Sequence, residues 1–587
     1  MYVRKTKIVC TIGPASDSPE TLEKLMLSGM NVARLNFSHG SHENHLILAE
    51  NIKRIREKLE KPVALLADTK GPEIRIKTFK QGPIALESGD KFTLTTKEIE
   101  GSKEKVSVTY KELTQVLEPG NRVLLDDGLI ALEVEEITDT DIVCKVLNGG
   151  PLSNRKSINL PGIKTSMPYM DEKDRDDIKF AYDNDFDFIA LSFVRSAADI
   201  VQVKSLLDEM GPNRLELIAK IENAEGVENI DEIIREADGI MVARGDLGVE
   251  IRFEELPAIQ KTMISKCYRA GKKVITATQM LESMVRNPRP TRAEVTDVAN
   301  AIHDGTSATM LSGETAAGKY PIESLETMVK IAEETEQSID FKQKFNDISR
   351  GDELSSNITN AVSYATCATA HDLGAAAIVA VSLNGSSGRM VARYRPQVPI
   401  VVSTPMVKTY MQMALTWGVV PMLSEYVEST EELFKTAAEQ ALNSGVAKDG
   451  ELVVITGSSS TVSGITNSLQ VHVLGNILAS GVGACGEGRV TSRACVISRR
   501  SSNVNFNVGD VLVIDKTTND ILRLLKRSKG LVTEEAPEES GAVAAAIALD
   551  LPVVAAVEGA TRVIADGSGI ILDPVRGYIH NRSAEEA

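Results

Sequence analysis

The 587-residue chain lacks the long apolar runs, the basic surface and the clustered cysteines that mark several large classes of protein. No apolar stretch is long enough to span a bilayer, so we expect no membrane role. The six cysteines are scattered and form no Cys-x-x-Cys pair, which argues against a zinc site and a disulfide framework. The net charge of −17 argues against nucleic-acid binding, which needs a basic surface. An anionic substrate would therefore need a local cluster of arginine and lysine.

The N-terminus leaves no room for a secretory signal peptide. The charged start Met1–Lys5 runs almost directly into the strand-like segment Lys7–Ile12, whereas a signal peptide continues into a longer apolar region. We therefore expect a cytoplasmic protein. At roughly 100–200 residues per domain, a chain of this length predicts about three to five domains.

Eight short apolar segments alternate with amphipathic helical patterns, which is typical of an α/β protein with a TIM (β/α)8 barrel. The segments are Ile8–Gly13, Val32–Ser38, Val63–Thr69, Phe188–Val194, Leu217–Glu222, Ile240–Asp246, Val274–Met280 and Ser307–Ser312. A helix is predicted at Pro19–Ser28, with Ser18 as N-cap and Gly29 after its end. Thr291 and Glu294 have the spacing of a capping box, which predicts the start of another helix. We expect the chemistry on the loops that follow the C-terminal ends of the strands.

The alternation stops after the third strand, where period-2 patterns such as Phe92–Thr95 are separated by turn residues. We therefore assign residues 1–70 and 168–340 to the barrel and residues 71–167 to an inserted β-barrel lid domain. A lid at this place would overhang the catalytic face. Residues 341–473 return to α/β alternation and are expected to form an effector domain. Residues 474–587 are expected to form an extra C-terminal α/β domain.

Two neighbouring strand ends carry charged groups at the predicted mouth of the barrel. Lys220 and Glu222 share one face by alternation, and Asp246 follows the next strand. Two carboxylates of this kind fit Mg²⁺, which leaves its other positions to water and substrate. A strand-end salt bridge is the simpler alternative for Lys220 and Glu222 taken alone. Gly245 would let backbone N–H groups approach an anionic substrate.

Strands two and three end in further polar groups. Arg34 lies on the second strand and Arg75 follows the third, and both suit phosphate. A set of oxygen donors with a single negative charge suits a weakly bound monovalent cation. These donors are Asn36, Ser38, Asp68 and the carbonyl of Thr69. A pair of polar strand-end turns is the alternative.

Three more segments offer weaker signals. Thr278 follows the seventh strand, where its hydroxyl would help to protonate an enolate carbon, although such a threonine is more often a turn or capping group. Gly313–Tyr320 nearly matches a P-loop, but Tyr320 replaces the Ser or Thr that would reach Mg²⁺. Gly481–Gly486 matches a dinucleotide fingerprint, yet Arg489–Arg499 after it has the pattern of a strand instead of a helix.

Two loops of the third domain are rich in glycine and serine, and such loops offer N–H and hydroxyl donors to a phosphate. Loop flexibility alone is the alternative. The candidate effector residues are Ser382, Asn384, Gly385, Ser386, Ser387, Gly457 and Ser458. The Ser458–Ser463 stretch has no Arg or Lys, so a sugar bisphosphate is favoured less than a sugar phosphate or a nucleoside monophosphate.

Over about residues 1–473 the chain resembles the pyruvate kinase family. The stretches that carry the resemblance, in family order, are Met30–Gly40, Asp68–Arg75, Ser157–Gly162, Ala219–Asn223, Ala243–Glu250, Thr278–Met284, Arg289–Asn300 and Ser312–Thr315. The resemblance implies transfer of a phosphoryl group from phosphoenolpyruvate to ADP, giving pyruvate and ATP in the last step of glycolysis. It also implies Mg²⁺ (or Mn²⁺) and K⁺ as cofactors, a phosphorylated allosteric activator and a homotetramer.

The resemblance also implies roles for individual residues. Lys220, Thr278 and Arg34 are implied to be catalytic, and Glu222 and Asp246 to hold Mg²⁺. The implied K⁺ ligands are Asn36, Ser38, Asp68 and Thr69. The implied substrate contacts are Arg34, Lys220, Ala243, Arg244, Gly245, Asp246 and Thr278, and the implied nucleotide contacts are Arg34, Asn36, His39, Arg75 and Lys156. Glu73 stands where K⁺-independent relatives carry a lysine, so we expect K⁺ dependence.

The C-terminal region resembles the mobile phosphohistidine domain of phosphoenolpyruvate-utilising enzymes. Gly541 stands where that domain has its histidine, and Ile547 stands at the usual arginine position. His472 and His580 match no motif. We therefore expect a structural or regulatory tail and not a phosphohistidine relay. A catalytically silent phosphometabolite sensor with the same fold is the main alternative for the whole chain.

Overall fold

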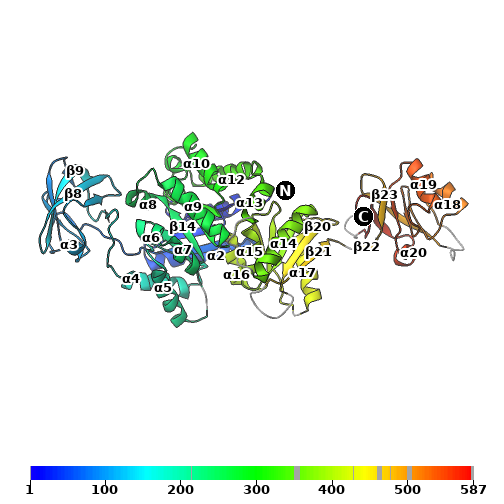
Figure 1. Ribbon diagram of the computed structural model, residues 1–587, viewed down its shortest axis with the longest axis horizontal. Coiled ribbons are helices and arrows are strands. Elements are labelled where there is room, and N and C mark those ends of the chain that lie inside the picture. Colours follow the sequence, from blue (N-terminus) through cyan, green and yellow to red (C-terminus); the bar gives the residue numbers. More distant parts are fainter. Residues whose placement is uncertain are drawn as a thin grey trace. The chain divides into compact units, whose positions relative to one another are not determined.

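The computed structural model describes residues 2–212, 215–349, 357–427, 429–458, 466–475, 477–498 and 505–582 (Figure 1). The chain forms two compact units. The first comprises Met1–Leu373, Ala377–Gln440 and Val454–Gln470, and the second comprises Gly374–Ala376, Ala441–Val453 and Val471–Ala587. The four predicted domain boundaries stay a prediction. Within the described residues, no helix combines the length and the apolar character needed to cross a membrane.

The first unit contains the predicted barrel, a closed ring of eight parallel strands. These are β1 (Lys7–Thr11), β2 (Val32–Asn36), β3 (Ala64–Asp68), β12 (Phe188–Leu191), β13 (Glu216–Ile221), β14 (Gly239–Ala243), β15 (Lys273–Ala277) and β16 (Ala308–Leu311). Each overlaps a predicted segment but ends earlier. The last polar residues of the predicted segments therefore leave the barrel wall and form the loops at its mouth.

Helices surround the barrel, and two of them begin where the sequence predicts. Helix α1 (Pro19–Ser28) is capped by Ser18, whose side chain accepts a hydrogen bond from the N–H of Thr21, and it ends at the left-handed Gly29. Helix α10 (Arg292–Asp304) begins with the predicted capping box. The other barrel helices are α2 (His42–Lys58), α4 (Glu172–Asp183), α5 (Ala197–Met210), α6 (Ala224–Glu228), α7 (Ile230–Glu236), α8 (Arg244–Glu250), α9 (Leu256–Arg269), η1 (Glu282–Val285), α11 (Gly313–Ala316) and α12 (Pro321–Gln337).

The predicted β insertion lies between β3 and β12, and its strands are coloured cyan in Figure 1. Its six-stranded sheet has the order β11-β7-β8-β9-β5-β6, and β4 pairs with β10. These elements are β4 (Ile84–Leu86), β5 (Lys91–Thr95), β6 (Lys105–Ser107), α3 (Leu113–Val116), β7 (Arg122–Leu125), β8 (Ile130–Ile137), β9 (Asp141–Asn148), β10 (Gly150–Leu152) and β11 (Ile158–Asn159). The insertion has a hydrophobic core of its own, which includes Phe92 and Leu132. We call this insertion the lid.

The α/β region that follows contains a five-stranded sheet with the order β19-β18-β17-β20-β21. Its elements are α13 (Phe341–Ser349), α14 (Ile358–Asp372), β17 (Ala377–Val381), α15 (Ser386–Ala392), β18 (Ile400–Thr404), α16 (Val407–Gln412), η2 (Met413–Leu415), β19 (Val419–Leu423), α17 (Thr430–Asn443), β20 (Leu452–Gly457) and β21 (Ser468–Val473). Ala414 and Leu415 of η2 belong to the same apolar cluster as Val9 and Ile218 inside the barrel. The short helix η2 thus packs against one end of the barrel core.

The second unit contains an eight-stranded sheet with the order β22-β29-β28-β24-β25-β26-β27-β23. Its elements are β22 (Ile477–Ser480), β23 (Val482–Cys485), β24 (Val490–Ile497), β25 (Val511–Ile514), α18 (Asn519–Leu525), β26 (Gly530–Thr533), α19 (Gly541–Ala548), β27 (Val553–Ala555), α20 (Ala560–Val563), β28 (Gly569–Asp573) and β29 (Tyr578–Asn581). The predicted strand after Gly486 is confirmed as β24, so the dinucleotide-like glycines do not open a helix.

Candidate active site

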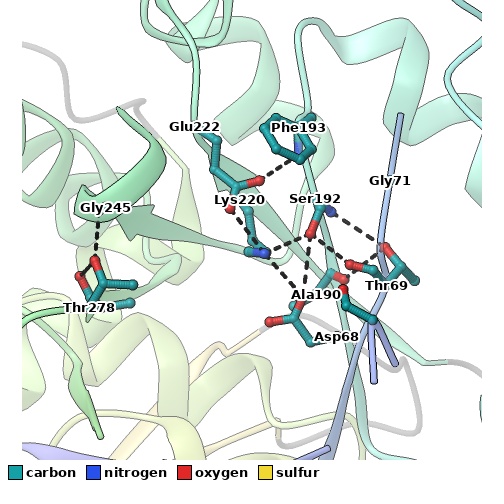
Figure 2. A network of polar contacts seen from close by, with 12 residues as sticks. Asp68, Thr69, Gly71, Ala190, Ser192, Phe193, Lys220, Glu222, Gly245 and Thr278 are labelled. Atoms are coloured by element: carbon teal, nitrogen blue, oxygen red, sulfur yellow. Dashed lines mark hydrogen bonds and ion pairs between the residues drawn. The ribbon is translucent and has the colours of Figure 1, made fainter. Parts of the chain in front are cut away.

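Lys220 lies at the centre of a buried polar network at the C-terminal ends of three barrel strands (Figure 2). Its Nζ is 2.6 Å from Ser192 Oγ, 3.1 Å from Asp68 Oδ1 and 3.0 Å from Glu222 Oε1. Burial lowers the pKa of this amine, but the attraction of Asp68 and Glu222 outweighs burial, so its pKa is raised. Lys220 therefore carries a fixed positive charge at the mouth of the barrel.

Glu222 and Asp246 place two carboxylates beside this charge. Glu222 is buried, and its Oε2 accepts a hydrogen bond of 2.7 Å from the backbone N–H of Phe193. Burial raises the pKa of Glu222 to about 7, Lys220 opposes this rise and Asp246 adds to it. Burial also raises the pKa of Asp246. Glu222 is buried and Asp246 is partly buried, and the negative charge of Asp246 raises the proton affinity of Glu222, so the pair favours a bound cation.

The chemistry of these donors fits Mg²⁺. Among the described residues, no cluster of three or more His, Cys, Asp or Glu side chains is placed to hold a metal ion. Mg²⁺ needs no such cluster, because it commonly takes one or two carboxylates and completes its shell with water and substrate oxygens. Glu222 and Asp246 meet that requirement.

Arg34 and Asp68 form a buried pair next to Lys220. Arg34 Nε lies 2.6 Å from Asp68 Oδ2, and Arg34 Nη1 donates to the hydroxyl of Thr11 over 2.7 Å. Burial raises the pKa of Asp68, but the positive charges of Arg34 and Lys220 lower it by a larger amount, so the net shift is downward. Asp68 thus stays ionised and fixes both cationic groups.

The four candidate K⁺ donors lie on adjacent strand ends. Asn36 and Asp68 are register partners on β2 and β3. The amide oxygen of Asn36 accepts from the N–H of Ser38 over 3.1 Å, and the carbonyl of Thr69 accepts from the hydroxyl of Ser192 over 2.7 Å. The structure brings Asp68 and Thr69 into the Lys220 network, whereas Ser38 is exposed on the loop after β2.

Thr278 and Gly245 contact each other on the opposite side of the mouth (Figure 2). The hydroxyl of Thr278 accepts from the N–H of Gly245 over 2.8 Å and donates to the carbonyl of Ala277 over 2.6 Å. Thr278 has a φ of 67°, an uncommon conformation for a β-branched residue. The guanidinium of Arg244 donates to both carboxylate oxygens of Asp297 and to the Thr278 carbonyl. The side chain of Arg244 therefore stabilises the loop that contains Thr278.

Of the candidate nucleotide residues, Arg34 reaches the Lys220 network through Asp68, whereas Arg75, Lys156 and His39 lie outside it. On the lid side, Arg75 pairs with Glu73 over 2.8 Å, and Lys156 pairs with Asp126 over 2.7 Å. His39 lies on the loop after β2, where its carbonyl contacts the ring of His45. The structure thus places these residues around the mouth without direct contact to Lys220 in the part of the chain that it describes.

A cavity lies between the lid and the mouth of the barrel. It is lined by Glu73, Asn159, Phe193, Arg195, Asp246 and Glu250, together with neighbouring residues. Asn159 of the lid donates to Glu250 at the end of α8 over 3.1 Å. The cavity reaches Asp246, so a molecule bound there would contact both the lid and the candidate Mg²⁺ site.

Sequence reasoning missed Ser192, although a signal for it existed. Ser192 lies at the end of the predicted fourth strand, where alternation places it on the same face as Ala190. A buried hydroxyl at that position needs polar partners, and it finds Lys220 and the Thr69 carbonyl. A polar residue on the inner face of an otherwise apolar strand end was the sequence signal that could have indicated Ser192.

The first effector loop follows β17, and its Gly385 is left-handed and precedes helix α15. The N–H of Ser386 donates to the amide oxygen of Asn384 over 3.1 Å, and the hydroxyl of Ser382 contacts the same oxygen. Ser387 and Thr466 share a hydrogen bond of 2.7 Å between their hydroxyls. Of the second loop, Gly457 and Ser458 are described, and residues 459–463 lie outside the described residues. The effector site stays a prediction.

The N-terminus of helix α19 carries an internal carboxylate where the mobile domain would have its histidine. Thr517 and Ser540 accept from the N–H groups of Ala542 and Val543. Both hydroxyls donate to Glu535 Oε2, over 2.5 and 2.7 Å. These contacts use the N–H groups of the second and third residues of the helix and link them, through the two hydroxyls, to the Glu535 carboxylate.

A barrel whose mouth holds a charged lysine, two neighbouring carboxylates and a phosphate-compatible arginine defines a barrel enzyme suited to moving a phosphoryl group. Comparison with known proteins gives the family. Residues 3–325 match the family model of the pyruvate kinase barrel domain, residues 360–472 that of the pyruvate kinase alpha/beta domain, and residues 506–577 that of the mobile domain of PEP-utilising enzymes. The chain belongs to the pyruvate kinase family and is a phosphotransferase.

Individual relatives agree with this assignment over most or nearly all of the chain. A pyruvate kinase of Geobacillus stearothermophilus is 46% identical over 584 residues, with 99% of each chain covered. One of Bacillus licheniformis is 44% identical over 589 residues, covering 99% of this chain and 100% of the relative. A crystal structure of a pyruvate kinase from Cryptosporidium parvum is similar with a TM-score of 0.77 and 39% identity, over 80% of this chain and 96% of that one.

Proposed function

We propose that the chain transfers the phosphoryl group of phosphoenolpyruvate to ADP, giving pyruvate and ATP as the last step of glycolysis. The observation that supports this most is the position of the Lys220 amine between Asp68, Glu222 and Ser192. Phosphoryl transfer needs positioned positive charge more than covalent help, and a rigidly held ammonium supplies it.

In this mechanism a β-phosphate oxygen of ADP attacks the phosphorus of phosphoenolpyruvate, and the bond from phosphorus to the enol oxygen breaks. Lys220 and Arg34 neutralise the charge on the moving phosphoryl group. Mg²⁺ held by Glu222 and Asp246 would neutralise further charge on the substrate oxygens. The enolate of pyruvate then takes a proton at its carbon, and Thr278 belongs to the hydroxyl network that delivers it.

We propose K⁺ at Asn36, Ser38, Asp68 and Thr69, and nucleotide contacts by Arg34, Asn36, His39, Arg75 and Lys156. The adjacency of Asn36 and Asp68 on β2 and β3 supports the K⁺ site. Glu73 already pairs with Arg75, so the position that would carry a substituting ammonium holds a carboxylate. K⁺ is therefore expected to be required.

We further propose a cytoplasmic homotetramer that a phosphorylated metabolite activates through the loops at residues 382–387 and 457–458. The N–H of Ser386 and the hydroxyl of Ser382 converge on Asn384, and this group of polar atoms supports the first loop as part of the activator site. A panel of sugar phosphates and nucleoside monophosphates at subsaturating phosphoenolpyruvate tests this part. No response to any of them would overturn it.

The catalytically silent alternative is not favoured, because the lysine and both carboxylates are present and brought together. A coupled assay for pyruvate formed from phosphoenolpyruvate and ADP decides between the two. Turnover that requires Mg²⁺ supports the proposal. A folded, metal-loaded protein without turnover would overturn it.

A further inference from the structure

Two linkers connect the lid to the barrel. The outgoing linker follows β3 and passes through Gly71, and the returning linker ends at Asp171, the N-cap of helix α4. A domain attached in this way is positioned by whatever holds its linkers, because small changes there move the whole lid. The groups that fix Gly71 and Asp171 therefore matter for how the lid meets the barrel mouth.

One buried carboxylate holds both linkers. Asp174 Oδ1 accepts from the N–H of Gly71 over 3.0 Å, and Asp174 Oδ2 accepts from the N–H of Asp171 over 3.3 Å. The residue is 4% exposed. Asp174 stands at the third position of α4, where a carboxylate normally closes a capping box with the N-cap residue alone. Here the other carboxylate oxygen, Oδ1, accepts from Gly71, which lies about a hundred residues earlier in the chain.

The outgoing linker also lies directly on the Lys220 network. Gly71 has a φ of 69°, and a Cβ at this position would lie 2.8 Å from the carbonyl oxygen of Ser192 and 2.9 Å from its Cβ. Only glycine allows so close an approach. The hydroxyl of Ser192 is the partner of Lys220 Nζ at 2.6 Å (Figure 2). The linker that Asp174 holds is thus in contact with the residue that holds the catalytic amine.

We propose that Asp174 is a positioning residue that fastens the two lid linkers to each other and keeps the outgoing linker against Ser192. Its carboxylate sets the orientation from which the lid closes over the cavity, and it does so without touching substrate. The consequence for turnover rests on the proposed function, whereas the fastening of the linkers does not.

Asp174→Asn provides the test, because an amide has one acceptor oxygen and leaves one of the two linker N–H groups without a partner. Glu294→Gln is the matched control. Glu294 also stands third in a capping box and accepts from its N-cap residue Thr291 and from a distant N–H, that of Ser283. Its contacts do not involve the lid linkers.

Hydrogen exchange is measured on peptides that cover residues 69–73 and 166–172. We expect exchange in at least one of these peptides to be about tenfold faster in Asp174→Asn, with exchange in β13 to β16 unchanged and with no such change in Glu294→Gln. A lid that is closed for a smaller fraction of time also raises the apparent KM for ADP several-fold while kcat at saturation changes less than about twofold.

The outcomes separate cleanly. Unchanged exchange in both linker peptides, or equal effects in Glu294→Gln, overturns the role of Asp174. If Asp174→Asn does not fold, Gly71→Ala tests the same contact from the other side, because its added Cβ displaces the linker from Ser192. It should show the same faster exchange, and normal exchange would overturn the proposal. A wild-type chain without turnover defeats the proposed function but leaves the exchange result to decide on Asp174.

Discussion

The hydroxyl oxygen of Ser192 and the amine of Lys220 are 2.6 Å apart, and the same hydroxyl donates to the carbonyl of Thr69 over 2.7 Å. Ser192 therefore holds the amine on one side and the third barrel strand on the other. All three groups are buried or nearly buried, and a hydrogen bond is stronger there than in water. The position of the amine therefore depends strongly on this hydroxyl.

Replacing Ser192 with alanine should lower kcat by about ten- to a hundredfold, since Lys220 loses one of its three partners. The KM for phosphoenolpyruvate should change less. Steady-state kinetics with both substrates varied checks this split. A variant with normal kcat would show that Asp68 and Glu222 position the amine without Ser192.

Replacing Lys220 with methionine should lower kcat by at least about a thousandfold, because the lost charge acts on the phosphoryl group during transfer. Binding of Mn²⁺ in place of Mg²⁺, followed by its effect on water proton relaxation, should change little. Lys173→Met is a control, since that lysine donates to the carbonyl of Phe37 and lies outside the Lys220 network. Near-normal turnover by Lys220→Met would refute the role given to the amine.

Activity should fall steeply when K⁺ is removed from a Na⁺-free buffer, and Glu73→Lys should restore part of it. The carboxylate of Glu73 now pairs with Arg75, and a lysine at this position would bring an ammonium to the outgoing linker. Initial rates in tetramethylammonium buffer with and without K⁺ measure the effect. Full wild-type activity without K⁺ contradicts the assignment of the cation site.

Lys7 gives a pH dependence of stability. Burial, aided by the charge of Arg4, lowers the pKa of Lys7 to about 7 in the folded chain. Between this value and the unfolded pKa near 10.5, the unfolded state binds more protons, so the contribution of Lys7 to stability rises with pH.

The variant Lys7→Met removes this rise. The free energy of unfolding of the wild type minus that of Lys7→Met should therefore increase by about 2 kcal/mol from pH 7 to pH 9. Denaturant titrations of both proteins at the two pH values test this. A difference that does not change with pH would show that Lys7 keeps its proton over the whole range.

A chain that ends at Val473 should keep kcat within a few-fold of the full chain, because the candidate catalytic groups lie before residue 320. It should also be less stable. In the second unit, Arg489 donates to the carbonyls of Asp449 and Gly450, and these contacts would be lost. Kinetics and thermal melts of both chains provide the measurement. A folded but inactive truncated chain would give the tail a part in the active site.

The barrel and its charged mouth were predictable from the sequence because both depend on local patterns. Alternation on a strand fixes which face Lys220 and Glu222 share, and parallel strands in a closed barrel bring their carboxyl ends together. The resemblance to pyruvate kinases then added roles that no pattern gives.

The links between distant segments were not predictable. In the sequence, Asp174 has the pattern of an ordinary acidic residue in the first turn of a helix. No neighbouring residue indicates that it also accepts a hydrogen bond from Gly71. Likewise, Gly245 was expected to offer its N–H to a substrate, whereas the structure shows that N–H bound to Thr278. Such contacts depend on how loops cross in space, which neither propensity nor periodicity encodes.

The closure of the barrel has a consequence for synthesis in the cell. Strand β1 pairs with β16, so Lys7 and Ala308 are register partners although about three hundred residues separate them. At roughly 5–20 residues per second, a ribosome takes roughly 15–60 seconds to deliver the partner of the first strand. The lid strands pair across at most about seventy residues, as Ile84 of β4 does with Leu152 of β10, so the whole lid is synthesised well within that interval. Strand β1 can pair early with β2, where Val9 and Val32 are register partners, but its other edge must wait for β16. The yield of active enzyme should therefore depend on how well folding helpers shield that open edge during translation.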